Sequence, residues 1–348
     1  MRRQLKRCAL QAVYHTGAYR LIPRSYAGIG TIFVIHKVVS NKTESLATWL
    51  TITVDFLDRV LALLKTRADF VRLDDVRERL ARAEPVKAPR PFIVLTFDDG
   101  FRDNLTLGLP ILQRHGVPAT VYVPSGAPDR NLDPWPWRLE RAIREVSEVS
   151  LDLPELPRRL SVQTLEEKRA AFGLLTEHIH RNIPANRHLP ELLLPKARVS
   201  DESLIAGQFA SWDELRELAS DRLITIGGHT VTHASLRDLE EDQAMAEIGN
   251  GKRRLEAQLD VAVSHFAYPY GARSNCGPRE FALVARAGFA TGVTAKDGNI
   301  FHEHRGHLTC LPRRGLCRSK EEIAAPILDM SGAPTALSSR WRNPLVTV

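Results

Sequence analysis

Seven short apolar runs alternate with longer amphipathic stretches along most of the chain, and this alternation restricts the fold more than any other feature. Each run has the length of a buried strand, and most are bounded by glycine, proline or a charged residue. The runs cover residues 31–35, 92–97, 119–123, 223–226, 264–268, 290–294 and 308–311. Strands that alternate with helices form parallel sheets with crossover helices. We therefore predict an α/β fold, a distorted (β/α) barrel of about seven strands.

Amphipathic stretches between these runs predict the helices that cover such a barrel. Their apolar residues recur at the three- and four-residue spacing of a helix face. They span residues 54–64, 73–82, 105–115, 212–219, 240–259 and 278–287. Ser211, with Glu214 three residues later, has the pattern of a capping box at a helix start. Gly116 and Gly288 stand where helix C-caps belong.

Residues 129–209 interrupt the alternation with scattered prolines and a charged helical stretch around 165–180. We interpret this region as an insertion in a single domain that spans 1–330, with a tail at 331–348. Because the insertion follows the third strand, it can extend over the mouth of the barrel, where loops of such enzymes bind substrate. It forms either a substrate platform or a peripheral helical cap that only packs.

The chain carries 48 Lys and Arg against 41 Asp and Glu, which gives a net charge of +7. This excess favours anionic surroundings, but the sequence has no motif typical of nucleic-acid binding, so we expect no nucleic-acid partner. The apolar runs fall far below the roughly 20 residues of a transmembrane helix. The basic N-terminus is not followed by the apolar core of a signal peptide. We expect a cytoplasmic protein, which a helix at 5–21 could attach peripherally to the inner membrane face.

Two adjacent carboxylates, Asp98 and Asp99, follow an apolar run at its C-terminal end. Barrel enzymes carry their catalytic groups at this position. Neighbouring residues at a strand end point in different directions, so one carboxylate can bind a cation while the other accepts a proton. The alternative is a solvent-facing turn, because Asp-Asp-Gly is also a common turn sequence.

Two histidines, His229 and His233, follow another apolar run. Histidines four residues apart share one face of a helical turn and can bind one metal through two imidazole nitrogens. With Asp99 the set becomes two imidazoles and one carboxylate, which leaves an open position for water or substrate. The set predicts a divalent metal, with zinc as the expected ion. Other divalent ions, and a structural site closed to solvent, are the alternatives.

Three motifs in a fixed order make the sequence resemble the polysaccharide deacetylase family, the carbohydrate esterases with the NodB homology domain. The motifs are TFDDG at 96–100, HTVTH at 229–233 and YPYG at 268–271. The FAYPYG form of the third motif is similar to that of an exopolysaccharide deacetylase branch. The resemblance implies a distorted (β/α) barrel and a metal-dependent hydrolase that removes acetyl groups from N-acetylated sugars.

The resemblance also implies a role for each matching residue. Asp98 would be the general base, and Asp99, His229 and His233 would be the metal ligands. The backbone N–H of Tyr270 would stabilise the oxyanion. The chemistry agrees, because a divalent ion polarises the acetyl carbonyl and acidifies water while a free carboxylate takes the proton.

The sequence departs from the family pattern at two positions. Ala267 stands where many members carry an arginine that orients the base, and we predict that Arg313 supplies this charge; the alternative is a surface arginine. The late Leu-x-His triplet that usually provides the general acid is missing. We predict His307 for that role because it lies closest to the final strand in a histidine cluster. His36, at the end of the first strand, is the competing candidate.

Trp135 and Trp137 in the insertion either stack on sugar rings or pack in the core of the insertion. We predict a substrate that is an N-acetylhexosamine-containing saccharide or polysaccharide. An O-acetyl esterase or a non-sugar amidase would use the same site, because the site recognises an acyl group rather than its carrier. A third hypothesis, raised by Ala267, is a saccharide-binding protein with little or no turnover.

Overall fold

The computed structural model describes residues 2–81, 90–151, 153, 155–193, 201–317, 321–339 and 345–346. Within this part of the chain, seven parallel strands close into a ring. In ring order they are β1 (Gly30–Ile35), β12 (Leu311–Gly315), β11 (Thr291–Asp297), β10 (His265–Ala267), β9 (Ile224–Gly228), β6 (Ala119–Val123) and β5 (Phe92–Phe97). The ring closes because β1 pairs with β12 on one side and with β5 on the other. The predicted barrel of about seven strands is confirmed.

Successive residues of a barrel strand face opposite sides of the sheet. In β1, Phe33 and Ile35 pack outward against the covering helices, whereas Ile32 belongs to a separate apolar cluster that fills the barrel. Every residue of β1, β5 and β6 is buried. Coverage on both faces explains why these strands are continuous apolar runs rather than alternating ones.

Helices cover the outside of the barrel where the periodicity predicts them. They are α3 (Val54–Lys65), α4 (Val76–Ala81), α5 (Leu109–His115), α11 (Trp212–Ser220), α12 (Glu241–Leu259) and α13 (Pro278–Arg286). The predicted capping box is present, because the side chains of Ser211 and Glu214 each accept a hydrogen bond from the other's backbone N–H. Gly116 ends α5 in a left-handed conformation, with φ of 62°. Residue 82, the last of the predicted helix 73–82, lies outside the described residues.

The last barrel strand lies later in the sequence than predicted. Leu308–Cys310 form a short 3-10 helix, and β12 begins only at Leu311. The prediction ended at that residue because Pro312, Arg313 and Arg314 are unusual in a buried strand. Both arginine side chains are nevertheless buried, because Arg313 forms an ion pair with Asp98 and Arg314 donates hydrogen bonds to Asn299 and Thr335.

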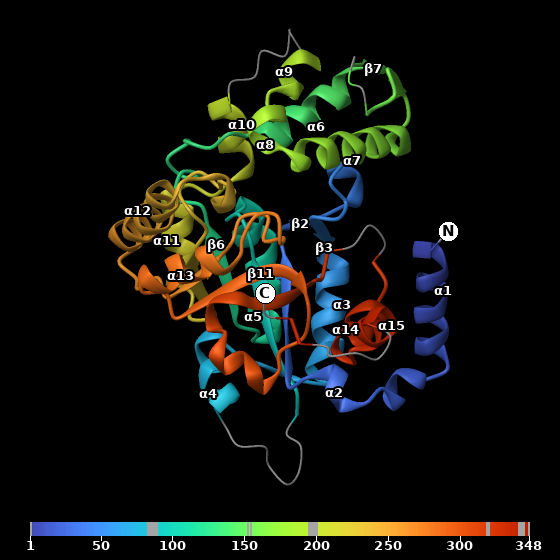
Figure 1. The fold of residues 1–348 in the computed structure, drawn as a ribbon, viewed down its shortest axis with the longest axis vertical. Coiled ribbons are helices and arrows are strands. Elements are labelled where there is room, and N and C mark those ends of the chain that lie inside the picture. Colours follow the sequence, from blue (N-terminus) through green and yellow to red (C-terminus); the bar gives the residue numbers. More distant parts are fainter. Residues whose placement is uncertain are drawn as a thin grey trace.

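Residues 129–209, the predicted insertion, fold into a helical unit over one end of the barrel, which we call the cap (Figure 1). Its elements are α6 (Trp135–Glu145), β7 (Glu148–Ser150), β8 (Arg159–Ser161), α7 (Leu165–Arg181), α8 (Ile183–Asn186), α9 (Leu189–Leu193) and α10 (Asp201–Gln208). An apolar cluster of its own, separate from those of the barrel, holds the cap together. Residues 152, 154 and 194–200 of this segment lie outside the described residues.

One loop of the barrel is built into the cap. It joins two short strands that the sequence did not predict, β2 (Lys37–Val39) and β3 (Thr51–Thr53). Leu46 and Ala47 of this loop belong to the apolar cluster of the cap. The carboxylate of Glu140 in α6 accepts a hydrogen bond from the backbone N–H of Leu46 at 2.9 Å. The loop and the cap therefore share one core.

The first helix of the chain packs against the late helices beside the barrel (Figure 1). Leu10, Val13 and Tyr14 contact a small apolar cluster from the C-terminal helices. None of the helices in the described part of the chain is long and apolar enough to cross a bilayer. The terminal helices are α1 (Arg2–His15), α2 (Arg24–Ala27), α14 (Ala324–Met330) and α15 (Ala333–Ser339). The last of these falls within the predicted tail, of which residues 340–344 and 347–348 lie outside the described residues.

Candidate active site

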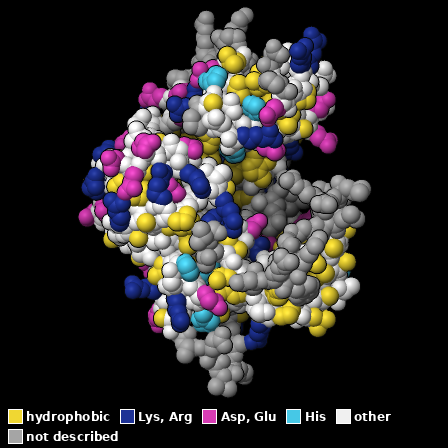
Figure 2. Space-filling view, in the orientation of Figure 1, with side chains coloured by type: hydrophobic (Ala, Val, Ile, Leu, Met, Phe, Trp, Pro, Cys, Tyr) yellow, Lys and Arg dark blue, Asp and Glu magenta, His cyan; other side chains and the backbone are white. Residues whose placement is uncertain are grey.

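The carboxyl ends of the barrel strands meet the cap around a cavity of about 560 Å³. This volume lies in the range of small-molecule and saccharide pockets. Hydrophobic side chains gather in the hollow between the cap and the barrel (Figure 2). Nine of the predicted site residues line the cavity, namely His36, Asp98, Asp99, Trp135, Trp137, His229, His233, Tyr270 and Arg313. The tenth, His307, does not.

Asp98 and Asp99 leave β5 in a tight turn that separates their carboxylates. The backbone N–H of Asp98 still donates to the carbonyl of Ile35 at 2.9 Å, so it continues the pairing with β1. Asp99 and Gly100 then adopt left-handed conformations, with φ of 75° and 65°. A Cβ on Gly100 would lie 3.1 Å from the side chain of Val123, which leaves little room for any other residue. The two carboxylates consequently face different partners.

Arg313 of β12 forms a bidentate ion pair with Asp98. Its Nη1 and Nη2 donate to Oδ1 and Oδ2 of Asp98, each at 2.7 Å. Its Nε donates to the carbonyl of Thr294 at 2.9 Å, which fixes the guanidinium plane. Burial raises the pKa of Asp98, but the charge and hydrogen bonds of Arg313 outweigh burial and leave that pKa below its ordinary value. Asp98 is therefore held as a carboxylate.

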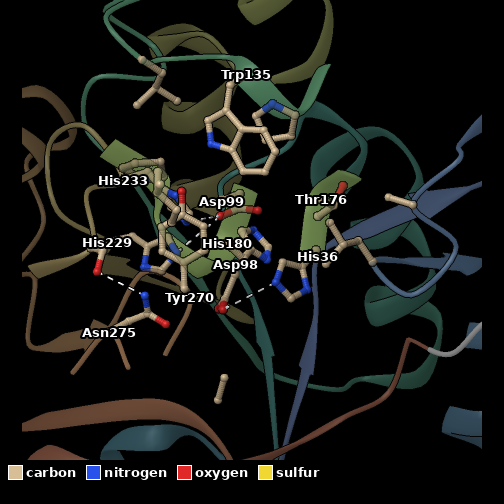
Figure 3. A pocket seen from close by; sticks show the side chains of 18 of the residues that line it. His36, Asp98, Asp99, Trp135, Thr176, His180, His229, His233, Tyr270 and Asn275 are labelled. Atoms are coloured by element: carbon tan, nitrogen blue, oxygen red, sulfur yellow. Dashed lines mark hydrogen bonds and ion pairs between the residues drawn. The ribbon is translucent and has the colours of Figure 1, made fainter. Parts of the chain in front are cut away.

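Asp99, His229 and His233 converge on one point (Figure 3). Oδ1 of Asp99 lies 3.4 Å from Nε2 of His229 and 3.3 Å from Nε2 of His233. Nδ1 of His229 lies 2.7 Å from the carbonyl oxygen of Ala267. Because a carbonyl only accepts, Nδ1 carries the proton and Nε2 keeps its lone pair for a metal. Two imidazoles and a carboxylate within one coordination sphere fit a divalent ion such as zinc.

The two histidines do not share a helical turn, contrary to the prediction from their spacing. Residues 229–235 form a loop after β9. Within it, Thr230 and His233 have φ of 66° and 59°, which no α-helix contains. The backbone N–H of Gly126 donates to the carbonyl of Val231 at 2.8 Å and ties the loop to the end of β6. A turn of this loop, rather than helical periodicity, brings the imidazoles together.

His36 lies at the end of β1, and its Nε2 is 4.0 Å from Oδ2 of Asp98 (Figure 3). Its side chain is 25% exposed and lines the cavity. Burial lowers the pKa of His36, and the nearby carboxylates offset this only in part. The imidazole is therefore neutral near pH 7, when it can accept a proton from a neighbour and pass it on.

The structure does not bring His307 to this cavity, so its prediction as a site residue is corrected. His307 is exposed and lies just before β12. Since β12 runs from Leu311 toward the mouth, the residues that precede it lie at the opposite end of the barrel. The adjacent 3-10 helix at His302–Gly306 packs against α4 there. Nearness in sequence to the final strand does not bring a residue to the mouth, because residues that precede a barrel strand lie at the opposite end from those that follow it.

Tyr270 lies in the turn that follows β10 and has φ of 61°. No described residue accepts a hydrogen bond from its backbone N–H. Its ring packs edge-on against His233, with ring centroids 4.8 Å apart. The backbone of Tyr270 therefore offers an unused donor beside the metal-binding set.

Comparison with known proteins agrees with this geometry. Residues 86–276, more than half of the chain, match the polysaccharide deacetylase family. The chain belongs to the polysaccharide deacetylase family. No protein of curated function matches the sequence.

Solved structures share the fold of this family member. The Streptococcus pyogenes deacetylase PplD in complex with acetate has 17% sequence identity and a TM-score of 0.56, over 86% of this chain and 97% of that chain. IcaB from Ammonifex degensii has 15% identity and a TM-score of 0.53, over 88% of this chain and 98% of that chain. The likeness extends over most of the chain, the ring of strands included.

In this member of the polysaccharide deacetylase family, the cap supplies aromatic rings to the cavity. Trp135 is buried, and its ring meets that of His180 edge-on with centroids 5.4 Å apart. Trp137 packs against Phe209 at 4.9 Å and against Phe101 at 5.8 Å. Both tryptophans also line the cavity. Packing and substrate contact, the two alternatives from the sequence, are therefore compatible.

His180 of α7 is a cavity residue that the sequence analysis did not predict. Its ring lies against Tyr270, with centroids 5.3 Å apart (Figure 3). Burial lowers the pKa of His180. The histidine stands in a charged helix with no neighbouring motif, so only the position of the insertion over the mouth could have indicated it.

Proposed function

We propose that this polysaccharide deacetylase is a zinc-dependent hydrolase that removes N-acetyl groups from an N-acetylhexosamine-containing saccharide. One observation carries the proposal: the Asp98 carboxylate, paired with Arg313, lies next to Asp99, which faces His229 and His233. A purely structural metal site has no use for a second, ionised carboxylate at its edge. Membership of the family and the position of these residues on one cavity support the same conclusion.

Each polar residue at the mouth has a task in such a hydrolysis. A divalent metal bound by Asp99 and the two loop histidines would polarise the acetyl carbonyl and acidify a water molecule. Asp98 accepts the proton of that water, and Arg313 holds Asp98 ionised and oriented. The backbone N–H of Tyr270 donates to the oxygen that gains negative charge when water attacks the carbonyl carbon. His36 takes the proton from Asp98 and delivers it to nitrogen as the carbon–nitrogen bond breaks.

The products of this reaction are acetate and a free amino sugar. The rings of Trp135 and Trp137 line the cavity on the cap side and support a pyranose, whose apolar face packs on aromatic surfaces. The carbohydrate therefore lies between the cap and the strand ends, with its acetyl group toward Asp99.

The test is acetate release from N-acetylglucosamine oligomers by the metal-stripped chain and by the same chain reloaded with zinc. Asp98→Asn is expected to abolish release, because asparagine cannot take the proton of water. Asp213→Asn, on the surface of α11 with a side chain 94% exposed, is the matched control and should leave release unchanged. Release from O-acetyl but not N-acetyl sugars would show that the substrate is an O-acetyl ester rather than an N-acetyl amide. Tight zinc binding without release from either substrate would contradict a sugar deacetylase.

A further inference from the structure

We propose that Glu247 of α12 is a positioning residue for the metal ligands His229 and His233. Its Oε2 accepts hydrogen bonds from the backbone N–H groups of Val231 and Thr232, both at 2.9 Å. Its Oε1 accepts a third bond from Oγ1 of Thr232 at 3.0 Å. One carboxylate thus fixes the residues between the two histidines. The inference rests on the proposed metal site.

The loop that carries His229 and His233 contains backbone N–H groups that need a hydrogen-bond acceptor from outside the loop. Thr230 and His233 flank the clamped residues and both have left-handed backbones, which are unfavourable for residues with a Cβ and most of all for a β-branched one. The clamped N–H groups belong to no helix or strand. Partly buried donors without an acceptor destabilise a conformation, so the carboxylate offsets the cost of this turn.

Helix α12 is built to approach the loop closely. A Cβ on Gly251 would lie 2.8 Å from the carbonyl oxygen of Thr230, so only glycine allows the helix and the loop to touch. Glu247 stands one turn earlier, on the same face of the helix. On the side of the loop away from α12, the carbonyl of Thr230 accepts a hydrogen bond from the N–H of Ser125 at 3.1 Å. The loop is therefore held between α12 and the end of β6.

The two ligands depend on this loop to different extents. His229 is also fixed through Nδ1, which donates to the carbonyl of Ala267. Within the described part of the chain, Nδ1 of His233 has no hydrogen-bond partner of this kind. Metal-ligating imidazoles are normally oriented by such a partner. The position of His233 consequently depends on the backbone that Glu247 holds.

Three variants separate hydrogen-bond reach from charge. Glu247→Gln keeps an oxygen that can accept from both N–H groups and an amide that can donate to the hydroxyl of Thr232, but it removes the charge. Glu247→Asp keeps the charge and withdraws the carboxylate by one methylene. Glu247→Ala removes everything. We expect zinc affinity close to wild type for the glutamine variant, weaker binding for the aspartate variant, and binding about 10- to 100-fold weaker for the alanine variant.

The measurement is competition for zinc between the metal-stripped full chain and a chelating dye. Glu256→Ala is the matched control, because Glu256 is on the same helix and accepts the N–H of Val263 at 3.1 Å, away from the ligand loop. This control should lower the stability to urea and leave zinc affinity unchanged. Should Glu247→Ala fail to fold, the glutamine and aspartate variants decide the question.

Two results would overturn the inference. One is wild-type zinc affinity in Glu247→Ala. The other is weak binding by the glutamine variant together with wild-type binding by the aspartate variant, which would assign the effect to charge. Because zinc affinity is measured without substrate, absence of acetate release by a zinc-loaded chain would overturn the proposed function alone. Absence of zinc binding by the wild-type chain would overturn both.

Discussion

Arg313 and Asp98 are 215 positions apart in the sequence, yet the guanidinium of one holds both carboxylate oxygens of the other at 2.7 Å. Their side chains are only 2% and 5% exposed. The pair joins β12, the last strand of the barrel in sequence, to the turn after β5. The counter charge of Asp98 therefore comes from β12 and not from β10, where Ala267 stands.

Removal of the guanidinium should be costly even without metal or substrate. Arg313→Met is expected to lower the free energy of unfolding by about 3–5 kcal/mol, because it leaves the Asp98 carboxylate buried without a counter charge. Adding Asp98→Asn should recover a large part of the loss. Urea unfolding of the metal-stripped single and double variants measures both effects. Equal stability of wild type and Arg313→Met would contradict a buried, ionised Asp98.

His36 and His307 can be distinguished by the leaving group. His36→Ala should lower kcat for an N-acetyl sugar by about 100- to 10,000-fold, the usual contribution of a proton-transfer residue. The same variant should lose far less activity toward a nitrophenyl acetate, whose leaving group needs no proton. His307→Ala, at the opposite end of the barrel, should match wild type on both substrates. Equal losses of His36→Ala on amide and activated ester would exclude proton delivery by this residue.

Zinc should stabilise the folded chain as well as activate it. A ligand that binds only the folded state at 100 times its Kd adds about 2.7 kcal/mol to the free energy of unfolding. Zinc should therefore raise the Tm of the stripped chain, and His233→Ala should lose most of this rise. Thermal unfolding with and without zinc provides the measurement. A rise in Tm that persists in His233→Ala would place the ion elsewhere.

Asp103 should make the protein less stable as the pH rises from about 4 to neutrality. Burial raises the pKa of Asp103 to about 7, although Lys37 and the N–H of Val38 oppose this shift. The folded state thus binds the proton more tightly than the unfolded state, so stability contributed by this residue is highest below pH 3.8 and declines until about pH 7.

Asp103→Asn keeps an acceptor for the N–H of Val38, which donates to Asp103 at 2.9 Å, and removes the titration. Because Asp103 is only partly buried, solvent screens part of its charge, and we expect the variant to be about 1–2 kcal/mol more stable than wild type at pH 8. The difference should shrink toward pH 4. Urea unfolding at a series of pH values measures it, and a difference that does not vary with pH would contradict the raised pKa.

Local sequence patterns predicted most of the barrel. Buried strands are recognisable as apolar runs because both of their faces are covered, and the covering helices show their periodicity. These patterns do not predict the full extent of β12, because Arg313 and Arg314 are not typical of a buried strand. Their burial depends on Asp98, 215 positions from Arg313, and on Asn299, 15 positions from Arg314, and no pattern within a single strand indicates these partners.

Sequence patterns likewise predict some residues of the candidate site and not others. Asp98, Asp99, His229 and His233 stand directly after strands, so their convergence at one mouth follows from parallel topology. By contrast, the contribution of His180 depends on how the cap folds over the barrel, and nothing near it in sequence indicates this. The turn at 229–233 also could not be derived from spacing, because its left-handed residues are stabilised by a helix that comes later in the chain.

The double pairing of β1 determines when the site can exist during synthesis. This strand can pair with β5 once the first third of the chain has emerged, whereas its other edge waits for β12. Closure of the ring is a contact between distant segments and therefore a slow step. Chains that stop before residue 313 would have Asp98 but not its guanidinium. Premature termination there would yield barrels with an open seam and an unpaired β1 edge, the kind of surface that cells recognise as misfolded.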